Sequence, residues 1–212
     1  MNRAPDVGTI WGTGRNFPVA DGGPPDVPQL FVKNTHSVIG PGEPLQLTGS
    51  VATRVVAEGE LAIVIGDQCR DLVTAEQARA VIAGYCVAND VTARDLQEVD
   101  DHWSRGKGLD GFCPLGVEMV APRDMPTWKD VMIRTWVDDE LVQDESVAAA
   151  YVGPEELVCW ASQQFTLHPG DIFLLGTPAY RPAGDESRAV LKPGHTARVE
   201  ITGIGELITP VI

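Results

Sequence analysis

The chain has 212 residues, and its 30 acidic residues outnumber the 16 Lys and Arg residues, which gives a net charge of −14 at neutral pH. A protein this acidic repels phosphate backbones, so the charge argues against nucleic-acid binding and against a polybasic membrane contact. No apolar run approaches the length of a membrane span, and the first residues lack the apolar segment of a signal peptide. We therefore predict a soluble, cytoplasmic protein.

Glycine and proline divide the chain into short segments. The 22 glycines and 16 prolines are spread along the sequence, a pattern that predicts short strands joined by many turns. The most irregular stretch, 18–28, is rich in both residues, and we expect a surface loop there. The four cysteines are well separated and form no CxxC pair, so reduced, mostly buried thiols are expected.

The predicted elements are mostly strands. In chain order, strands are expected at 29–33, 60–65, 85–88, 131–137, 140–142, 172–175 and 196–201. A capping box of Thr74 and Gln77 begins a helix that runs to about residue 83. Pro154 begins another helix, whose first turn carries Glu155 and Glu156. No regular alternation of strands and helices is present, so an α+β, mostly β fold is predicted. No glycine-rich phosphate loop supports nucleotide binding.

Two glutamates at a strand entrance form the first candidate site. Glu58 and Glu60 are separated by one residue, so on a strand their side chains point to the same face, about 7 Å apart. A hard divalent cation would relieve their repulsion. The alternative is that both line the solvent face of a strand end. Asp90 follows the apolar strand at 85–88, where its carboxylate could point inward.

Further polar residues follow, each with an ordinary structural explanation when taken alone. Arg94 and Gln97 come within about two turns of a helix. Lys107 lies between two glycines, which allow a close approach to a ligand. Thr177 follows Gly176 at the end of an apolar strand.

Several motifs occur together in a fixed order. They are Gly14-Arg-Asn16, Phe31-Val-Lys33 with Ile39-Gly-Pro-Gly42, Glu58-x-Glu60, the run from Gly84 to Gln97, Lys107 before Asp110–Gly116, Pro169-Gly-Asp followed by Gly176-Thr-Pro178, and Ile201-Thr-Gly-Ile-Gly205. In this combination the sequence resembles the fumarylacetoacetate hydrolase family over about residues 10–212.

The resemblance implies a mixed β-sandwich roll. It implies one catalytic domain over 1–212, with an N-terminal segment at 1–28 that carries the lid loop and a core at 29–212. It also implies a homodimer that acts on a small 2-oxo carboxylic acid, with one Mg²⁺ or Mn²⁺ per chain. By the resemblance, Glu58, Glu60 and Asp90 bind the metal. Lys107, Arg94 and Gln97 carry the chemistry, and Thr177, Lys33 and Arg15 bind the substrate.

The lid departs from the family pattern. Hydrolytic members carry a His and a Glu there that activate the attacking water, but the corresponding positions are Ala20 and Gly23. Loss of a positioned general base removes about 10²–10⁴-fold in rate. His36 and His102 are the candidates to replace it.

The leading hypothesis is a metal-dependent hydrolase that cleaves a C–C bond in a small 2,4-dioxo acid of the acylpyruvate or fumarylpyruvate type. The alternative is a decarboxylase or isomerase of 2-oxo or 2-hydroxydienedioic acids, which demands less of a lid base. A second alternative is a relative that binds metal and ligand without catalysis.

Overall fold

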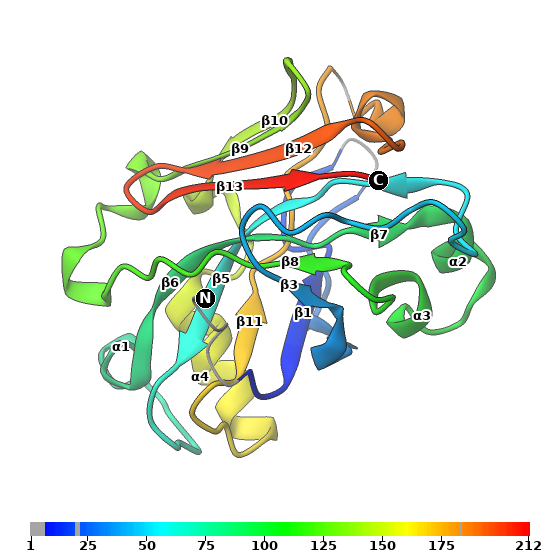
Figure 1. Cartoon of the computed structure of the whole chain (residues 1–212). Coiled ribbons are helices and arrows are strands. Elements are labelled where there is room, and N and C mark those ends of the chain that lie inside the picture. Colours follow the sequence, from blue (N-terminus) through cyan, green and yellow to red (C-terminus); the bar gives the residue numbers. More distant parts are fainter. Residues whose placement is uncertain (1–6, 20–21, 183) are drawn as a thin grey trace.

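The computed structural model describes residues 7–19, 22–182 and 184–212 (Figure 1). Its main sheet has five strands in the order β2 (Gln29–Lys33), β1 (Ile10–Gly14), β11 (Ile172–Leu174), β5 (Gly59–Ile65) and β6 (Ile82–Asn89). Only β1 and β11 run parallel among these neighbours, and the other pairs are antiparallel, so the sheet is mixed. Strand β1, which the sequence analysis did not predict, lies inside this sheet.

A second sheet and two small ones complete the strands. The second sheet is antiparallel, in the order β10 (Glu140–Ser146), β9 (Met132–Val137), β12 (Thr196–Ile201) and β13 (Gly205–Pro210). Strand β3 (Val38–Ile39) pairs with β8 (Cys113–Pro114), and β4 (Val55–Val56) pairs with β7 (Thr92–Ala93). The predicted α+β, mostly β fold is confirmed.

The α-helices are α1 (Ala75–Val81), α2 (Arg94–Val99), α3 (Ser104–Lys107) and α4 (Pro154–Gln164), and 3₁₀ turns occur at Thr35–Ser37, Pro122–Asp124, Trp128–Asp130, Val147–Ala149 and Glu186–Ala189. The capping box at Thr74 and Gln77 is present. Helix α1 ends at Val81, slightly earlier than predicted, because β6 already begins at Ile82. None of the described helices has the length and apolar character needed to cross a membrane.

The core explains where the site lies. Every residue of β5 is buried, and alternate side chains point to opposite faces. Leu61 and Ile63 join a cluster with residues of the second sheet and of α4, whereas Ala62 joins a different cluster with residues of β6 and β8. In Figure 1 the second sheet lies across the top of the main sheet. Strand β5, where the site begins, is therefore covered on both faces.

Gly59 allows the two sheets to approach at the entrance of β5. A Cβ on Gly59 would lie 2.1 Å from Thr135 Oγ1 of β9 and 2.9 Å from Val199 Cγ1 of β12. No side chain fits in that space. Because strand residues alternate, Gly59 faces the second sheet, and Glu58 and Glu60 face the other way.

The four cysteines are free, as predicted, and three of them are buried.

Candidate active site

Three acidic side chains converge at the entrance of β5. Glu58 directly precedes β5, Glu60 is its second residue, and Asp90 directly follows β6. Gly59 pairs with Asn89, and the Asp90 N–H donates to Glu58 O at 2.8 Å, so Asp90 is held beside Glu58. One carboxylate oxygen of each acid lies within 4.8 Å of the others, and all three residues are at most 2% exposed. The predicted metal ligands are thus brought together in the interior.

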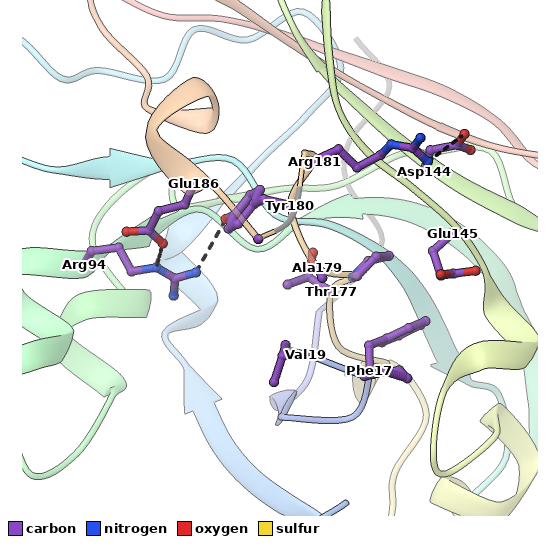
Figure 2. A pocket seen from close by; sticks show the side chains of 13 residues that line it. Phe17, Val19, Arg94, Asp144, Glu145, Thr177, Ala179, Tyr180, Arg181 and Glu186 are labelled. Atoms are coloured by element: carbon purple, nitrogen blue, oxygen red, sulfur yellow. Dashed lines mark hydrogen bonds and ion pairs between the residues drawn. The ribbon is translucent and has the colours of Figure 1, made fainter. Parts of the chain in front are cut away.

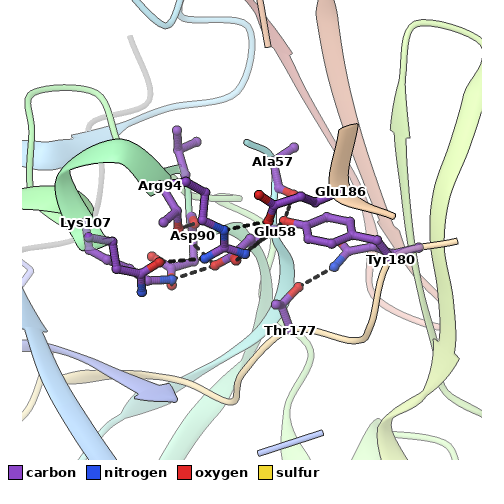
Figure 3. A network of polar contacts seen from close by, with 12 residues as sticks. Ala57, Glu58, Asp90, Arg94, Lys107, Thr177, Tyr180 and Glu186 are labelled. Carbon is purple, nitrogen blue, oxygen red and sulfur yellow. Dashed lines mark hydrogen bonds and ion pairs between the residues drawn. The ribbon is translucent and has the colours of Figure 1, made fainter. Parts of the chain in front are cut away.

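Three basic side chains contact these carboxylates, and Figure 3 shows Lys107 and Arg94 beside Glu58 and Asp90. Lys107 Nζ lies 2.5 Å from Glu58 Oε2 and also contacts Asp90 Oδ2. Lys33 Nζ lies 2.5 Å from Asp90 Oδ1, and the Arg94 guanidinium contacts Glu58 Oε1. Both lysines are almost completely buried. Glu58 and Asp90 are therefore paired with basic groups, as their burial requires, whereas Glu60 forms no ion pair with a described residue.

Close packing of α2 on α3 brings Arg94, Gln97 and Lys107 to one place. A Cβ on Gly106 would lie 3.0 Å from the backbone nitrogen of Gln97 and 3.1 Å from the backbone oxygen of Ala93, so this glycine allows the two short helices to be in contact. Arg94 Nη1 donates to Gln97 Oε1 at 2.7 Å, which orients the guanidinium.

The pKa values of Glu58 and Glu60 are shifted in opposite directions. Burial by itself would raise the pKa of Glu58, but the charges of Arg94 and Lys107 lower it to about 2. Glu60 lacks such a partner, so burial, reinforced by the charges of Asp90 and Glu58, raises its pKa well above the ordinary value. Burial opposes the charge of Lys107, yet the three carboxylates raise its pKa.

The donor set fits a divalent cation. The Lys107 ammonium already lies between oxygens of Glu58 and Asp90, where a cation shared by these residues is stabilised. Burial and the charges of Asp90 and Glu58 raise the pKa of Glu60, so a cation beside it would relieve this repulsion. Three clustered carboxylates are the ligands that Mg²⁺ and Mn²⁺ prefer. Glu58, Glu60 and Asp90 could hold such an ion.

A cavity of about 620 Å³ adjoins the cluster (Figure 2). Its lining residues are Phe17, Pro18, Val19, Arg94, Asp144, Glu145, Thr177, Pro178, Ala179, Tyr180, Arg181, Gly184 and Glu186. None of the three carboxylates lines the cavity, but Arg94 and Tyr180 line it and also contact Glu58. The Tyr180 hydroxyl donates to Ala57 O at 3.0 Å and lies 3.4 Å from Glu58 Oε1, and Arg94 Nε donates to Glu186 Oε2 at 2.8 Å.

The Gly-Thr-Pro turn connects the cavity to the carboxylates. The Gly176 N–H donates to Glu60 Oε2 at 2.6 Å. Gly176 has a φ of +102°, and a Cβ there would lie 3.0 Å from Thr13 O, so only glycine fits. The Thr177 hydroxyl donates to Gly59 O at 3.0 Å and accepts from Gln143 Nε2 at 2.7 Å.

Three residues of this region were missed by the sequence analysis. Tyr180 and Glu186 follow the Gly-Thr-Pro motif, so their proximity to it was the available signal. Gln143 carried no signal, because the strand around it was predicted to end at Val142.

Other predicted residues lie outside the cavity lining. Arg15 is exposed and has a φ of 56°. His36 and His102 are exposed, and neither lines the cavity. His102 instead borders a shallow surface pocket together with Phe31 and Trp103. Of the lid positions, residue 20 lies outside the described residues, and Gly23 has no atom within 4 Å of where a Cβ would be.

Comparison with known proteins identifies the family. The sequence profile described as fumarylacetoacetate (FAA) hydrolase C-terminal matches residues 7–212. The chain belongs to the fumarylacetoacetate hydrolase family. The relatives of this chain in the family include a hydrolase, an isomerase and a tautomerase.

Three relatives illustrate that range. The chain is 36% identical over 200 residues to the mitochondrial oxaloacetate tautomerase fahd2 of Xenopus laevis, covering 93% of this chain and 60% of that protein. It is 38% identical to the crystal structure of 5-carboxymethyl-2-hydroxymuconate delta-isomerase from Mycobacterium smegmatis, with a TM-score of 0.83, covering 97% of this chain and 79% of that one. It is 27% identical to the fumarylpyruvate hydrolase of Pseudomonas aeruginosa in complex with Mn²⁺ and pyruvate, with a TM-score of 0.84, covering 97% of this chain and 90% of that one.

Proposed function

We propose that this protein is a Mg²⁺- or Mn²⁺-dependent enzyme that forms and protonates the enolate of a small 2-oxo carboxylic acid. The observation that carries the proposal is the buried cluster of Glu58, Glu60 and Asp90 with the Lys107 ammonium on two of them. The family membership and the relative that binds Mn²⁺ and pyruvate support it.

Charge favours an anionic substrate in this site. The three carboxylates and Glu186, which is paired with Arg94, face three basic side chains, Lys33, Arg94 and Lys107, so the fully ionised cluster carries a charge of only about −1. Adding a doubly charged ion leaves the site positive, and a carboxylate ligand would restore the balance in a region where charges are poorly screened. Such an ion, held by Glu58, Glu60 and Asp90, would supply positive charge that polarises a carbonyl group.

The basic side chains have separate roles in the proposal. Arg94 borders the cavity and is oriented by Gln97 and Glu186, so it is placed to bind an incoming carboxylate. Lys107 is fixed by two charged contacts, and its Nζ holds the proton that stabilises a developing enolate oxygen. Thr177 lines the cavity together with Arg94.

Proton transfer within the substrate fits this cavity better than hydrolysis. Hydrolysis needs a base that activates water, and no histidine of the described chain lines the cavity. Tautomerisation and isomerisation move a proton between carbon and oxygen of the same molecule and need no attacking water. The tautomerase and isomerase relatives, at 36% and 38% identity, support this choice. We therefore place keto–enol tautomerisation or isomerisation of a 2-oxo acid first.

C–C bond hydrolysis, the leading hypothesis from the sequence, is the second candidate. The fumarylpyruvate hydrolase relative supports it, and the exposed carboxylate of Glu145 lines the cavity, where it could contact a water molecule. The homodimer implied by the family resemblance also stays a prediction, which light scattering in solution would test.

A spectrophotometric panel tests the proposal. Oxaloacetate, a 2-hydroxydienedioate and an acylpyruvate are assayed with Mn²⁺, with Mg²⁺ and with chelator. We expect enol–keto conversion of one of the first two, lost on chelation and in Glu60→Gln. The matched control Glu76→Gln changes an exposed carboxylate of α1 and should leave the rate unchanged. Turnover that survives chelation contradicts the proposal, and binding of metal and ligand without any turnover would favour the non-catalytic alternative.

A further inference from the structure

Strand β10 carries an irregularity that faces the site. Its pairing with β9 shifts between Leu141, opposite Trp136, and Gln143, opposite Thr135, so Val142 is an extra residue. Such a β-bulge changes the direction of the side chains that follow it. As a result Val142 and Gln143 are both buried, although neighbouring strand residues normally point to opposite faces.

The redirected Gln143 side chain joins two parts of the site. Its Oε1 accepts from the Gly59 N–H at 2.9 Å, and its Nε2 donates to Thr177 Oγ1 and to Pro178 O, each at 2.7 Å. Gln143 is 0% exposed, and these bonds use its acceptor and both of its donor hydrogens. A side chain with three such partners has one orientation only.

The bulge also holds the far end of the cavity loop. The Val142 carbonyl accepts from the Arg181 N–H at 2.8 Å. The loop between Thr177 and Arg181 is therefore fixed to β10 at both ends, and it carries Tyr180, which reaches Ala57 and Glu58.

We propose that Gln143 is a positioning residue that holds the substrate-contacting loop at Thr177 against the metal-binding segment at Gly59. It acts through Thr177 and touches neither metal nor substrate. The inference rests on the proposed function, because it assumes that a 2-oxo acid or its mimic binds beside Thr177.

The carboxylates themselves depend less on Gln143. The Glu58 N–H is held separately by Asn89 Oδ1 at 2.9 Å, and Glu60 is bound by Gly176 and lies within the β5–β6 ladder. Loss of Gln143 should therefore weaken ligand binding more than metal binding. A purely structural glutamine would change stability without this difference.

Calorimetric titrations of the full chain test the inference, with Mn²⁺ first and then with oxalate, a mimic of the pyruvate enolate, on the Mn²⁺-loaded protein. In Gln143→Leu we expect oxalate affinity to fall by about tenfold or more, the effect of losing a buried hydrogen-bonding partner, while Mn²⁺ affinity stays within about threefold. Thr209→Ala is the matched control, since the buried Thr209 hydroxyl of β13 makes no hydrogen bond to a described residue, and its oxalate affinity should be unchanged.

A double-mutant cycle identifies the route of the effect. If Gln143 acts through Thr177, Thr177→Val should cost much less oxalate affinity in Gln143→Leu than in the wild type. Additive losses would overturn the inference, as would unchanged oxalate affinity in a folded Gln143→Leu. Should Gln143→Leu fail to fold, Gln143→Asn keeps the amide but is one methylene too short to hold both partners, and full oxalate affinity in that variant would overturn the inference. A wild-type protein that binds neither Mn²⁺ nor oxalate would refute the proposed function itself.

Discussion

Gly59→Ala tests whether the contact between the sheets sets the position of the metal-binding segment. The added Cβ would lie 2.1 Å from Thr135 Oγ1 and 2.9 Å from Val199 Cγ1, well inside van der Waals contact. Neither atom can move far, because Thr135 and Val199 lie in paired strands of the second sheet and are at most 1% exposed. The entrance of β5 must therefore shift, together with Glu58 and Glu60 on either side of Gly59.

Overpacking of this kind costs about 1–3 kcal/mol. For a protein of this size each kcal/mol lowers the Tm by about 2–4 °C, so we expect a decrease of about 2–12 °C. The shift of the two carboxylates should also weaken Mn²⁺ binding.

Thermal unfolding with and without Mn²⁺ measures both effects. Gly23→Ala is the control, because no atom of a described residue lies within 4 Å of its Cβ position, and its Tm should not change. In the Gly59→Ala background, Thr135→Ala removes the nearest atom and should restore part of the Tm, with a coupling energy of about 0.5–3 kcal/mol. A Gly59→Ala protein with wild-type Tm and wild-type Mn²⁺ affinity would refute the reasoning.

Three further predictions concern the site. Lys107→Met should reduce turnover by about 10²–10⁴-fold because it removes the proton donor fixed between Glu58 and Asp90, and a steady-state rate near wild type would contradict the assigned role. In the metal-free protein, protonated Glu60 stabilises the fold, because the pKa of Glu60 is raised in the folded state. This stabilisation is complete below the ordinary pKa of 4.5 and is lost as the pH rises through the pKa of Glu60 in the folded protein. Mn²⁺ binding, in contrast, requires the ionised carboxylate. The rise in Tm caused by Mn²⁺ should thus grow as the pH rises above 4.5 in the wild type and stay flat in Glu60→Gln, and a rise independent of pH would exclude Glu60 as a ligand. His36→Ala and His102→Ala should each keep turnover within about twofold, since neither side chain lines the cavity, and a loss of 10²-fold or more in either would identify the replacement base.

Local patterns were sufficient for several strands and for the starts of two helices. The apolar run at 60–65, the capping box at Thr74 and Gln77, and the proline at 154 depend on neighbours in the chain, and each occurs as predicted. The spacing of Glu58 and Glu60 placed both carboxylates on one face for the same reason, since alternation along a strand is a local property. Lys107, Arg94 and Asp90 were found by the order of motifs, and the structure places them in one cluster.

Only the tertiary structure decided what lies around that cluster. Strand β1 is stabilised by β2 and β11, which are distant from each other in sequence, so its short segment gave no signal. Gln143 reaches the site because a β-bulge redirects its side chain. Tyr180 and Glu186 line the cavity because hydrogen bonds to β10 and to Arg94 of α2 hold the segment that carries them. The opposite pKa shifts of Glu58 and Glu60, which have only Gly59 between them, likewise depend on tertiary structure, because only folding brings Arg94 and Lys107 beside Glu58. Sequence alone determines residue types and local geometry, but long-range pairing and burial determine which of those residues can act together.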